Sequence, residues 1–591
     1  MSRSNSSRAG WNRRDFLKGG AAVMAAAYGL RPDWAMAEIP MQFDGSKFKL
    51  AAPEPNPKSG GVLRYGITMR PPHFDVHQSG TINSLASQGV QFDNLIRRDP
   101  RDSGKTIIPD LAHSWDISAD GKTYTFMLRK GVLFHDGAEL TSDDIKATFD
   151  RISKPPQGIS IPRSVLFRAV SEITAPDKYT VQFKLSEARP PNFIMSALAS
   201  GWNVIVRKKT LEDNNYNLRK VEIYPGTGPF KSVKRVENEV WKFEKNKNYW
   251  NNPLPYLDGI EFYHALPFST ELGSSILSGR TDYIRITDPV TVRKAKENPN
   301  LLTATFNQSV IQGVWLNHKK PPLNDPKVRR ALHLAFDRPA LIDVVKDVTP
   351  MQVGGFIYPF SEFATPKEEL FKRIGYQSDI GPALKEAKAL MAAAGFKDGL
   401  KEPLDFLVRD VPSFKLWAQA IQAMLQEGLG VKCNLRTVVE SVWFDDTANG
   451  HFDLAIGAIV STLLDPSDYF NAWYRTGGPQ NYSAWDNKEF NGLLDEIDRE
   501  VDPAKRIALV RKTEAIMEQE IPVLPVAWEQ INDVYAKYVK GHNPKDYFGI
   551  YDVVREDTFW LDKASGLRRH SGAAHSAEPG TYTHRPPLGL P

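Results

Sequence analysis

The chain has 591 residues, of which 41% are hydrophobic and 25% are charged, as in a large globular protein with roughly four domains of about 150 residues. No stretch approaches the roughly 18 consecutive apolar residues that span a bilayer, so we do not expect an integral membrane protein. The single cysteine, Cys433, excludes an intrachain disulfide and a cysteine-ligated metal cluster, and we expect it to be a plain strand residue.

The net charge of +5 is concentrated at the two ends of the sequence. Residues 1–37 hold six Arg or Lys against two Asp, a balance of +4, and residues 563–591 hold four against one Glu, a balance of +3. Residues 38–562 therefore carry −2. A nucleic-acid-binding protein would need a concentrated basic surface, so this balance argues against nucleic acid as a partner.

The first 37 residues have the three parts of a secretory signal peptide. Arg13 and Arg14 precede the triplet at 16–18, an apolar run follows over 19–30, and the segment ends in the Ala-Met-Ala of 35–37. This order predicts cleavage after Ala37, and the paired arginines favour twin-arginine export to the periplasm. The alternative is an amphipathic first helix in which the two arginines have no such role.

The first half of the remaining chain is predicted to be rich in strands. A Pro-rich segment over 38–57 comes first, and alternation of apolar and polar residues then predicts strands at 61–68, 124–129, 180–185 and 240–244. Asp120-Gly121 predicts a tight hairpin before the second of these strands. Thr141 is the predicted N-cap of a helix that runs to about residue 152.

Beyond about residue 311 the pattern changes to alternating helices and strands. Helical periodicity predicts helices over 327–336, 383–394 and 413–429, the last two ending at Gly395 and Gly430. Strands are predicted at 431–438 and 453–459, so this half should be layered α/β structure. The composition of 563–591, without periodicity, predicts a disordered tail.

Motifs for catalysis or metal binding are weak. Gly121-Lys122-Thr123 lacks the first glycine of a phosphate-binding loop, and Gly226-Thr227-Gly228 lacks the third glycine of a dinucleotide site. His73 and His77 are four residues apart, but no third ligand is evident. His135-Asp136-Gly137 is interpreted as a polar turn. We therefore predict no cofactor, no metal and no enzymatic activity.

A dozen short motifs between residues 58 and 560 occur in the order typical of the family 5 extracytoplasmic solute-binding proteins of ABC transporters, the oligopeptide- and dipeptide-binding class, which the chain resembles. The motifs are 93–96 (DNLI), 109–115 (PDLAHSW), 120–126 (DGKTYTF), 128–137 (LRKGVLFHDG), 226–230 (GTGPF), 248–250 (NYW), 278–282 (SGRTD), 321–325 (PPLND), 328–332 (VRRAL), 465–466 (DP), 481–483 (NYS) and 522–526 (PVLPV).

The resemblance implies an α/β, two-lobed periplasmic-binding-protein-like fold (type II, cluster C) with an extra N-terminal domain. Lobe I would comprise 58–90, 220–310 and 526–562, the extra domain 91–219, and lobe II 311–525. The protein would be a periplasmic, monomeric receptor of an ABC importer. A solute would bind between the lobes, favour their closure, and pass to the permease subunits.

One departure from the family bears on the ligand. Peptide-binding relatives have a G-W-x-A-D-Y-x-D-P segment whose aspartate pairs with the peptide α-amino group. The aligned stretch here, 458–466, retains Asp465 but has Thr462 at the position of that aspartate and Ile459 at that of the tryptophan. A hydroxyl does not replace a charge-assisted contact to an ammonium group. An opine, an oligosaccharide or a modified peptide therefore stands beside a peptide as the predicted ligand, with nickel and haem as less favoured ones.

Aromatic residues are dense around this segment, and ring faces with polar edges suit sugars and amphipathic ligands. The predicted ligand-binding residues are Met69, Arg70 and His73 in the turn after the first strand, and Trp443, Thr462, Asp465, Asp468, Tyr469, Trp473 and Arg475 in lobe II. The competing interpretation is structural: the tryptophans fill the core, Asp465 caps a turn, and residues 69–75 form a surface turn. Two other functions remain open, a secreted hydrolase with a carboxylate pair and a chaperone-like binder of unfolded segments.

Overall fold

The structure is a computed structural model that describes residues 48–67, 71–80, 82–99, 106–264, 270–286, 288–346, 349–359, 361–461, 463, 465–542 and 555–562. The predicted signal peptide and the predicted disordered tail lie outside these residues. In the part of the chain that is described, no helix is both long enough and apolar enough to cross a membrane.

An eleven-stranded sheet forms the centre of the molecule, with the strand order β15-β14-β16-β12-β17-β11-β1-β10-β9-β8 and with β13 paired to β17. Its strands are β1 (Val62–Gly66), β8 (Phe230–Val236), β9 (Val240–Lys245), β10 (Gly259–Tyr263), β11 (Tyr283–Ile286), β12 (Leu301–Leu316), β13 (Met351–Gln352), β14 (Leu404–Arg409), β15 (Cys433–Val438), β16 (Leu454–Val460) and β17 (Val523–Ala536). The strands predicted at 61–68, 240–244, 431–438 and 453–459 are confirmed by β1, β9, β15 and β16.

One end of this sheet is built from parallel strands with helical crossovers. Helix α12 (Pro412–Leu429) connects β14 to β15, and α13 (Glu440–Asn449) connects β15 to β16. The predicted apolar stripe buries Phe414, Trp417 and Ile421, and Gly430 ends α12 in the left-handed conformation that the sequence predicts. This end is the layered α/β structure expected for the second half of the chain.

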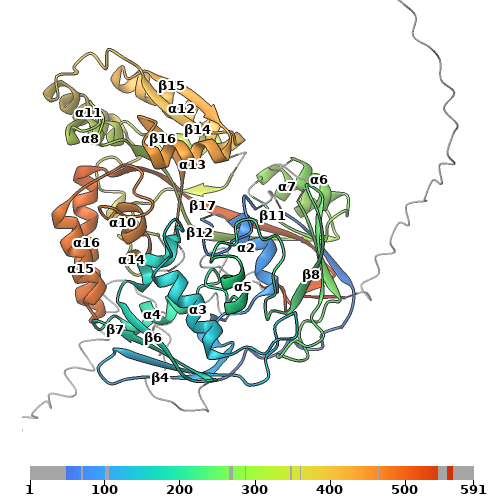
Figure 1. The fold of residues 1–591 in the computed structure, drawn as a ribbon. Helices are drawn as coiled ribbons and strands as arrows, with labels where there is room; N and C mark the ends of the chain where they lie inside the picture. The colour runs from blue at the N-terminus through green and yellow to red at the C-terminus, as the bar shows by residue number, and fades with distance from the viewer. Residues whose placement is uncertain are drawn as a thin grey trace, which may run out of the picture.

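The other end of the sheet mixes parallel and antiparallel pairs. Strand β1 pairs in parallel with β10 and β11, and β8, β9 and β10 form an antiparallel series. Helices α6 (Thr270–Leu277) and α7 (Pro289–Glu297) pack on this end, at the right of Figure 1.

A separate four-stranded antiparallel sheet has the order β4-β5-β7-β6. Its strands are β4 (Ala112–Ile117), β5 (Thr123–Leu128), β6 (Val170–Asp177) and β7 (Thr180–Leu185), and helix α3 (Ser142–Ser153) packs against it. Alternate residues of β5 and β7 are buried, and Phe183 contacts Phe149 of α3 with ring centroids 5.1 Å apart. The predicted hairpin at Asp120-Gly121, the strands at 124–129 and 180–185, and the N-cap at Thr141 are all confirmed.

The remaining elements cover the sheets or connect their strands. They are α2 (Ile82–Gln88), η2 (Gly89–Gln91), β2 (Ile96–Arg98), β3 (Ile107–Pro109), η4 (Pro162–Phe167), α4 (Pro191–Leu198), α5 (Lys208–Asp213), α8 (Pro326–Leu334), α9 (Arg338–Val345), α10 (Lys367–Leu370), α11 (Gly381–Ala393), α14 (Pro466–Tyr469), the π-helical turn η5 (Phe470–Tyr474), α15 (Lys488–Arg499), α16 (Pro503–Glu520), β18 (Val539–Lys540) and β19 (Trp560–Leu561). The helices predicted at 327–336 and 383–394 are confirmed by α8 and α11.

Strands β12 and β17 are the longest of the sheet, with 16 and 14 residues, and they pair along most of their length. Figure 1 shows them between the body that carries β14 to β16 and the part that carries β8 and β11. The buried apolar residues on the two sides belong to different clusters, one within 311–528 and the other including 230–301 and 534–561. The two long strands therefore run through both halves of the sheet.

Candidate ligand-binding site

The pairing of β12 with β17 changes register where these strands pass from one half of the sheet to the other. Asn307 pairs with Gln530, and Ile311 pairs with Trp528, so the three residues 308–310 lie opposite the single residue Glu529. A bulge of this kind leaves residues out of the ladder and redirects their side chains.

Strands of both halves end or change partner at this bulge. Val460, the last residue of β16, pairs with Val310, and the next N–H, that of Ser461, donates to the carbonyl of Ser309 at 3.0 Å. On its other edge, β17 passes from β11 to the short β13, which pairs with Trp528 and Glu529. Ligands of open α/β sheets bind at such points, beside the carboxyl ends of strands where the connectivity switches.

Buried polar side chains without hydrogen-bond partners gather at the bulge. Gln308 is 1% exposed and Ser309 is 2% exposed; among the residues that the structure describes, both amide atoms of Gln308 and the Ser309 hydroxyl have no partner. The Oε1 atom of the buried Gln312 also has no partner among the described residues. An unpaired buried polar group costs about 1–3 kcal/mol, so a cluster of them makes this bulge a candidate for a site completed by a bound molecule or by water.

The carboxylate of Glu529 belongs to the same group of side chains. Gln312 Nε2 donates to Glu529 Oε1 at 3.0 Å, and burial raises the pKa of Glu529 to about 7 against the opposing effects of this bond and of Arg409. Arg409 ends β14; its guanidinium donates to Glu440 at 2.6 Å and lies over the rings of Phe414, Trp443 and Phe444. We call Gln308, Ser309, Gln312, Glu529 and Arg409 the strand crossing.

The two predicted aspartates have partners between residues 461 and 506. Asp465 caps α14 by accepting from the N–H of Ser467, and both of its oxygens accept from the guanidinium of Arg506. Asp468 accepts from the N–H of Leu463 at 3.0 Å and from the Ser461 hydroxyl at 3.2 Å. Both carboxylates thus hold the segment after β16 in place.

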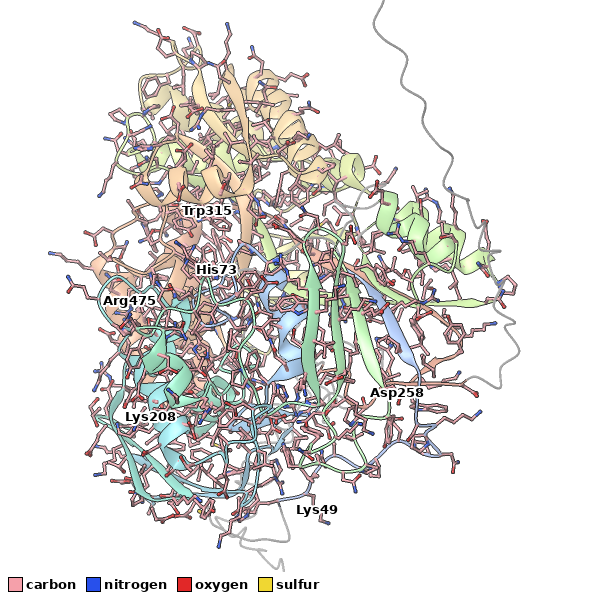
Figure 2. All side chains as sticks on the ribbon, turned by 45° about the vertical axis from the view of Figure 1, so that its right-hand side comes forward. Lys49, His73, Lys208, Asp258, Trp315 and Arg475 are labelled. Atoms are coloured by element: carbon pink, nitrogen blue, oxygen red, sulfur yellow. The ribbon has the colours of Figure 1, made fainter. Side chains whose placement is uncertain are left out.

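Arg475 and Tyr469 also have partners, which lie between residues 356 and 495. The Arg475 guanidinium donates to Asn471 at 2.6 Å and to Asp495 at 2.7 Å, and the Tyr469 hydroxyl donates to the carbonyl of Phe356 at 3.3 Å. Figure 2 labels Arg475 on the left side of the molecule, below and to the left of His73 and Trp315.

The predicted tryptophans pack around Trp315 of β12. The ring centroids of Trp443 and Trp473 lie 5.6 and 5.7 Å from that of Trp315, and all three side chains are buried. Gly457 of β16 makes room for them, because a Cβ atom there would lie 2.7 Å from both Trp315 and Trp443. These rings belong to the buried apolar cluster within residues 311–528.

In the turn after β1, His73 is 9% exposed and its Nδ1 has no partner among the described residues. Burial lowers the pKa of His73 to about 4, so its imidazole is neutral at pH 7. Met69, Arg70 and Thr462, the other predicted ligand contacts, lie outside the described residues.

His77 is held by protein groups. Its Nε2 lies 2.8 Å from the carbonyl of Val204, and its Nδ1 lies 2.7 Å from the guanidinium of Arg151, which also pairs with Asp75 at 2.5 Å. Among the described residues no group of three His, Cys, Asp or Glu side chains is placed to hold a metal ion. Cys433 is a buried strand residue, as predicted, and burial raises the pKa of its thiol to about 12.

The strand crossing was not predicted from the sequence. Its signal is a run of polar residues next to apolar ones in the long strands: Asn307-Gln308-Ser309 precedes Val310 and Ile311 in β12, and Glu529-Gln530 follows the apolar start of β17. In a strand buried on both faces such residues need partners, and this rule would have drawn attention to them.

A comparison with family models identifies the class of protein. The model described as "Bacterial extracellular solute-binding proteins, family 5 Middle" matches residues 106–481, which is more than half of the chain. The chain belongs to this family, and the predicted resemblance is confirmed. Members of this family are solute-binding proteins, and this is the class of protein that the sequence predicts.

Individual relatives agree with this assignment. The dipeptide-binding protein DppE of Bacillus subtilis is 24% identical over 77% of this chain and 84% of its own length. The periplasmic binding protein DppA of Helicobacter pylori, solved with the peptide STSA, has a TM-score of 0.75 at 24% identity, over 86% of this chain and 99% of that one. AgaA of A. tumefaciens R10, solved with agropinic acid, has a TM-score of 0.74 at 23% identity, over 85% and 99%. The two-lobed α/β fold is thereby confirmed.

Proposed function

We propose that the protein is a periplasmic receptor of an ABC importer that captures a peptide-like solute between its two lobes and delivers it to the permease. The observation that carries this proposal is the strand crossing, where the two strands shared by both halves of the sheet hold buried polar groups without partners. Peptide is the first ligand class, since the names of several relatives describe proteins that bind dipeptides or oligopeptides.

The lobes of this receptor would follow the predicted boundaries, with lobe I at 58–90, 220–310 and 526–562, the extra domain at 91–219 and lobe II at 311–525. The distribution of buried apolar residues supports this division. One cluster lies within 311–528, another holds residues of 95–205 together with Leu463, and a third combines 63–90, 230–301 and 534–561. Met69, Arg70 and His73 would approach the ligand from lobe I, and the stretch around Thr462 from lobe II.

The arginine pair at 13 and 14 would direct the folded protein through the twin-arginine pathway, with cleavage after Ala37. Cell fractionation tests this step. We expect the wild-type chain in the periplasmic fraction, shortened by 37 residues, and the R13K/R14K variant in the cytoplasm at full length. Periplasmic, cleaved R13K/R14K protein would show that another export route is used.

The ligand is identified by mass spectrometry of small molecules that co-purify with the mature protein, followed by thermal-shift assays of peptides, opines and oligosaccharides. A ligand at 100 times its Kd adds about 2.7 kcal/mol to the free energy of unfolding. The receptor assignment fails if no solute raises the melting temperature while the purified protein turns over a substrate.

An opine is the second candidate ligand, and Thr462 is the observation that favours it. A threonine at the position of the amine-binding aspartate removes the ionic contact that peptide-binding relatives have in this segment. The solved neighbour with agropinic acid has the same fold. Stabilisation by opines but not by peptides would select this candidate.

A further inference from the structure

Glu529 lacks a paired cation. Arg409 is the cation next to it, but the hydrogen bond of this guanidinium goes to Glu440 at 2.6 Å, and no described residue forms an ion pair with Glu529. The three side chains are partly buried, so an ionised Glu529 is poorly hydrated and its pKa is raised to about 7. A positively charged group on a ligand would stabilise the ionised form of Glu529.

Glu529 has the free hydrogen-bonding capacity that such a group requires. Its Oε1 accepts from Gln312, and no described residue donates to its Oε2. Gln312 is 3% exposed and lies on β12. Its hydrogen bond to Glu529 therefore restricts rotation of the carboxylate and holds it next to the bulge. A fixed carboxylate loses little conformational entropy when a ligand binds.

The neighbouring groups are complementary to an amide or another group that both donates and accepts. Gln308 offers an N–H donor and a C=O acceptor, and Ser309 offers a hydroxyl; none of the three has a partner among the described residues. Because 308–310 face Glu529 across the ladder, the carboxylate and these neutral groups belong to one site.

We propose that the strand crossing is the subsite for an amine-bearing end of the ligand: Glu529 accepts from the ammonium group, and Gln308 and Ser309 form hydrogen bonds with the adjoining peptide unit. This inference rests on the proposed function, and it names the ligand class as a peptide with a free amino group. It also assigns the ammonium contact to a carboxylate of β17 instead of the segment around Thr462.

The test uses a casein digest, half of which is acetylated to block its amines, and the mature protein freed of bound ligand. The peptide captured most strongly from the untreated half is identified by mass spectrometry, synthesised with a free and an acetylated amino terminus, and titrated calorimetrically. We expect the wild type to bind the free form roughly 10- to 100-fold more tightly, the range of a hydrogen bond to a charged group.

Glu529→Gln is the decisive variant, because it keeps the shape of the side chain and removes its charge. We expect this variant to bind the free and acetylated forms with nearly equal affinity, and binding of the acetylated form shows that it is folded. Glu518→Gln is the matched control, since burial raises the pKa of this carboxyl to about 7 as well, but its partner is Tyr376, outside the strand crossing, and this variant should keep at least a 10-fold preference.

Proton release gives a second readout that a structural role of Glu529 would not produce. At pH 6.5, binding of an ammonium group should expel a proton from the Glu529 carboxyl, so the heat of binding should depend on the ionisation enthalpy of the buffer. Arg409 and Glu440 are the charged groups next to it, and the same dependence should persist in Glu518→Gln and vanish in Glu529→Gln.

The outcomes separate this inference from the function on which it rests. If peptides bind but acetylation has no effect, or if Glu529→Gln keeps the preference, the amine subsite is wrong and the peptide receptor stands. If neither half of the digest yields a bound species, both the peptide function and the subsite are wrong.

Discussion

Two groups of buried polar residues in this molecule are built in opposite ways. In the first, which we call the arginine cluster, Asp498 of α15 lies 3.1 Å from Arg189 and 3.8 Å from Arg168, and Asn471 donates to it at 3.2 Å. In the second, the strand crossing, Gln308, Ser309 and Gln312 keep atoms without partners among the described residues. The first is a completed network, and the second is an incomplete one.

The comparison separates a structural role from a binding role. A buried charge that is paired and hydrogen-bonded has recovered most of its lost hydration, so the arginine cluster can join the segment 162–189 to lobe II without any ligand. Unpaired buried groups lower stability unless something else binds them. A ligand that occupies the strand crossing, as proposed, should therefore increase the free energy of unfolding.

Substitution of Asp498 should produce the largest effect. Asp498→Ala removes the carboxylate between Arg189 and Arg168. Arg168 then has no carboxylate partner among the described residues, and the 11% exposed Arg189 keeps Glu187 at 2.7 Å, whose side chain is 38% exposed. Removal of one partner of a buried ion pair costs about 3–5 kcal/mol, and we expect a loss of this size in the free energy of unfolding measured with urea.

Asp495→Ala is the control for this change. Asp495 lies on the same helix and pairs with Arg475, but its side chain is 53% exposed, so we expect a loss of about 1 kcal/mol or less. Equal losses for the two variants would contradict the structural role assigned to the arginine cluster.

Glu529 and Asp75 should change the free energy of unfolding in opposite directions as the pH rises, because the pKa of Glu529 is raised and that of Asp75 is lowered. The pKa of Glu529 is raised from 4.5 to about 7, so the folded state holds a proton that the unfolded state has released between these values. Its contribution to stability is present below pH 4.5 and is lost as the pH rises through about 7, by up to about 3 kcal/mol. Glu529→Gln should abolish this loss in urea unfolding at pH 4.5, 6 and 7.5.

Asp75, a paired carboxylate, gives the contrasting profile. Arg151, His77 and Gln78 overcome the effect of burial and lower the pKa of Asp75 from 3.8 to about 2. Its stabilisation is therefore present above pH 3.8 and lost on acidification through about 2.

The Glu529 prediction would be contradicted by parallel stability profiles. If the free energies of unfolding of the wild type and of Glu529→Gln run parallel between pH 4.5 and 7.5, Glu529 is not held in a protonated, buried state.

Local signals predicted much of the fold. The end of α12 at Gly430 and the N-cap of α3 at Thr141 depend on residues adjacent in sequence, and both were correctly placed. The arrangement of β12 and β17 depends on pairing between residues more than 200 positions apart, which no local pattern encodes. The order of the central sheet therefore came from the structure, whereas the family resemblance predicted the two-lobed fold.

The candidate site was harder to predict for the same reason. Asp465 was proposed as a ligand contact because of its motif, yet its charge is balanced by Arg506, 41 residues further on. Gln308 and Glu529 were not predicted as site residues, because neither belongs to a motif. Their proximity depends on the register of two strands that are distant in sequence. Burial and the absence of partners among the described residues, on which their proposed role rests, are properties of the fold.

Gln308→Met should stabilise the ligand-free protein. Methionine has a similar volume and no amide, so the substitution removes the cost of two unpaired polar atoms, and we expect a gain of about 1 kcal/mol in urea unfolding. The same variant should bind the captured peptide more weakly, since the hydrogen bonds to the ligand are lost. A clear loss of stability without ligand would mean that the amide already has a structural partner, and the contrast with the arginine cluster would fail.

The smallest effect is expected at the edge of the arginine cluster. Arg499 lies 3.7 Å from Glu187, but these side chains are 53% and 38% exposed, so water competes with the pair. Arg499→Ala should change the free energy of unfolding by about 0.2–1 kcal/mol, and 0.5 M NaCl should abolish the difference from the wild type because salt screens exposed charges. A larger, salt-resistant loss would show that the buried network extends to Arg499. The arginine cluster would then include the pair of Arg499 and Glu187 in addition to Asp498, Arg189 and Arg168, and the exposed pair could no longer be distinguished from the buried one by its contribution to stability.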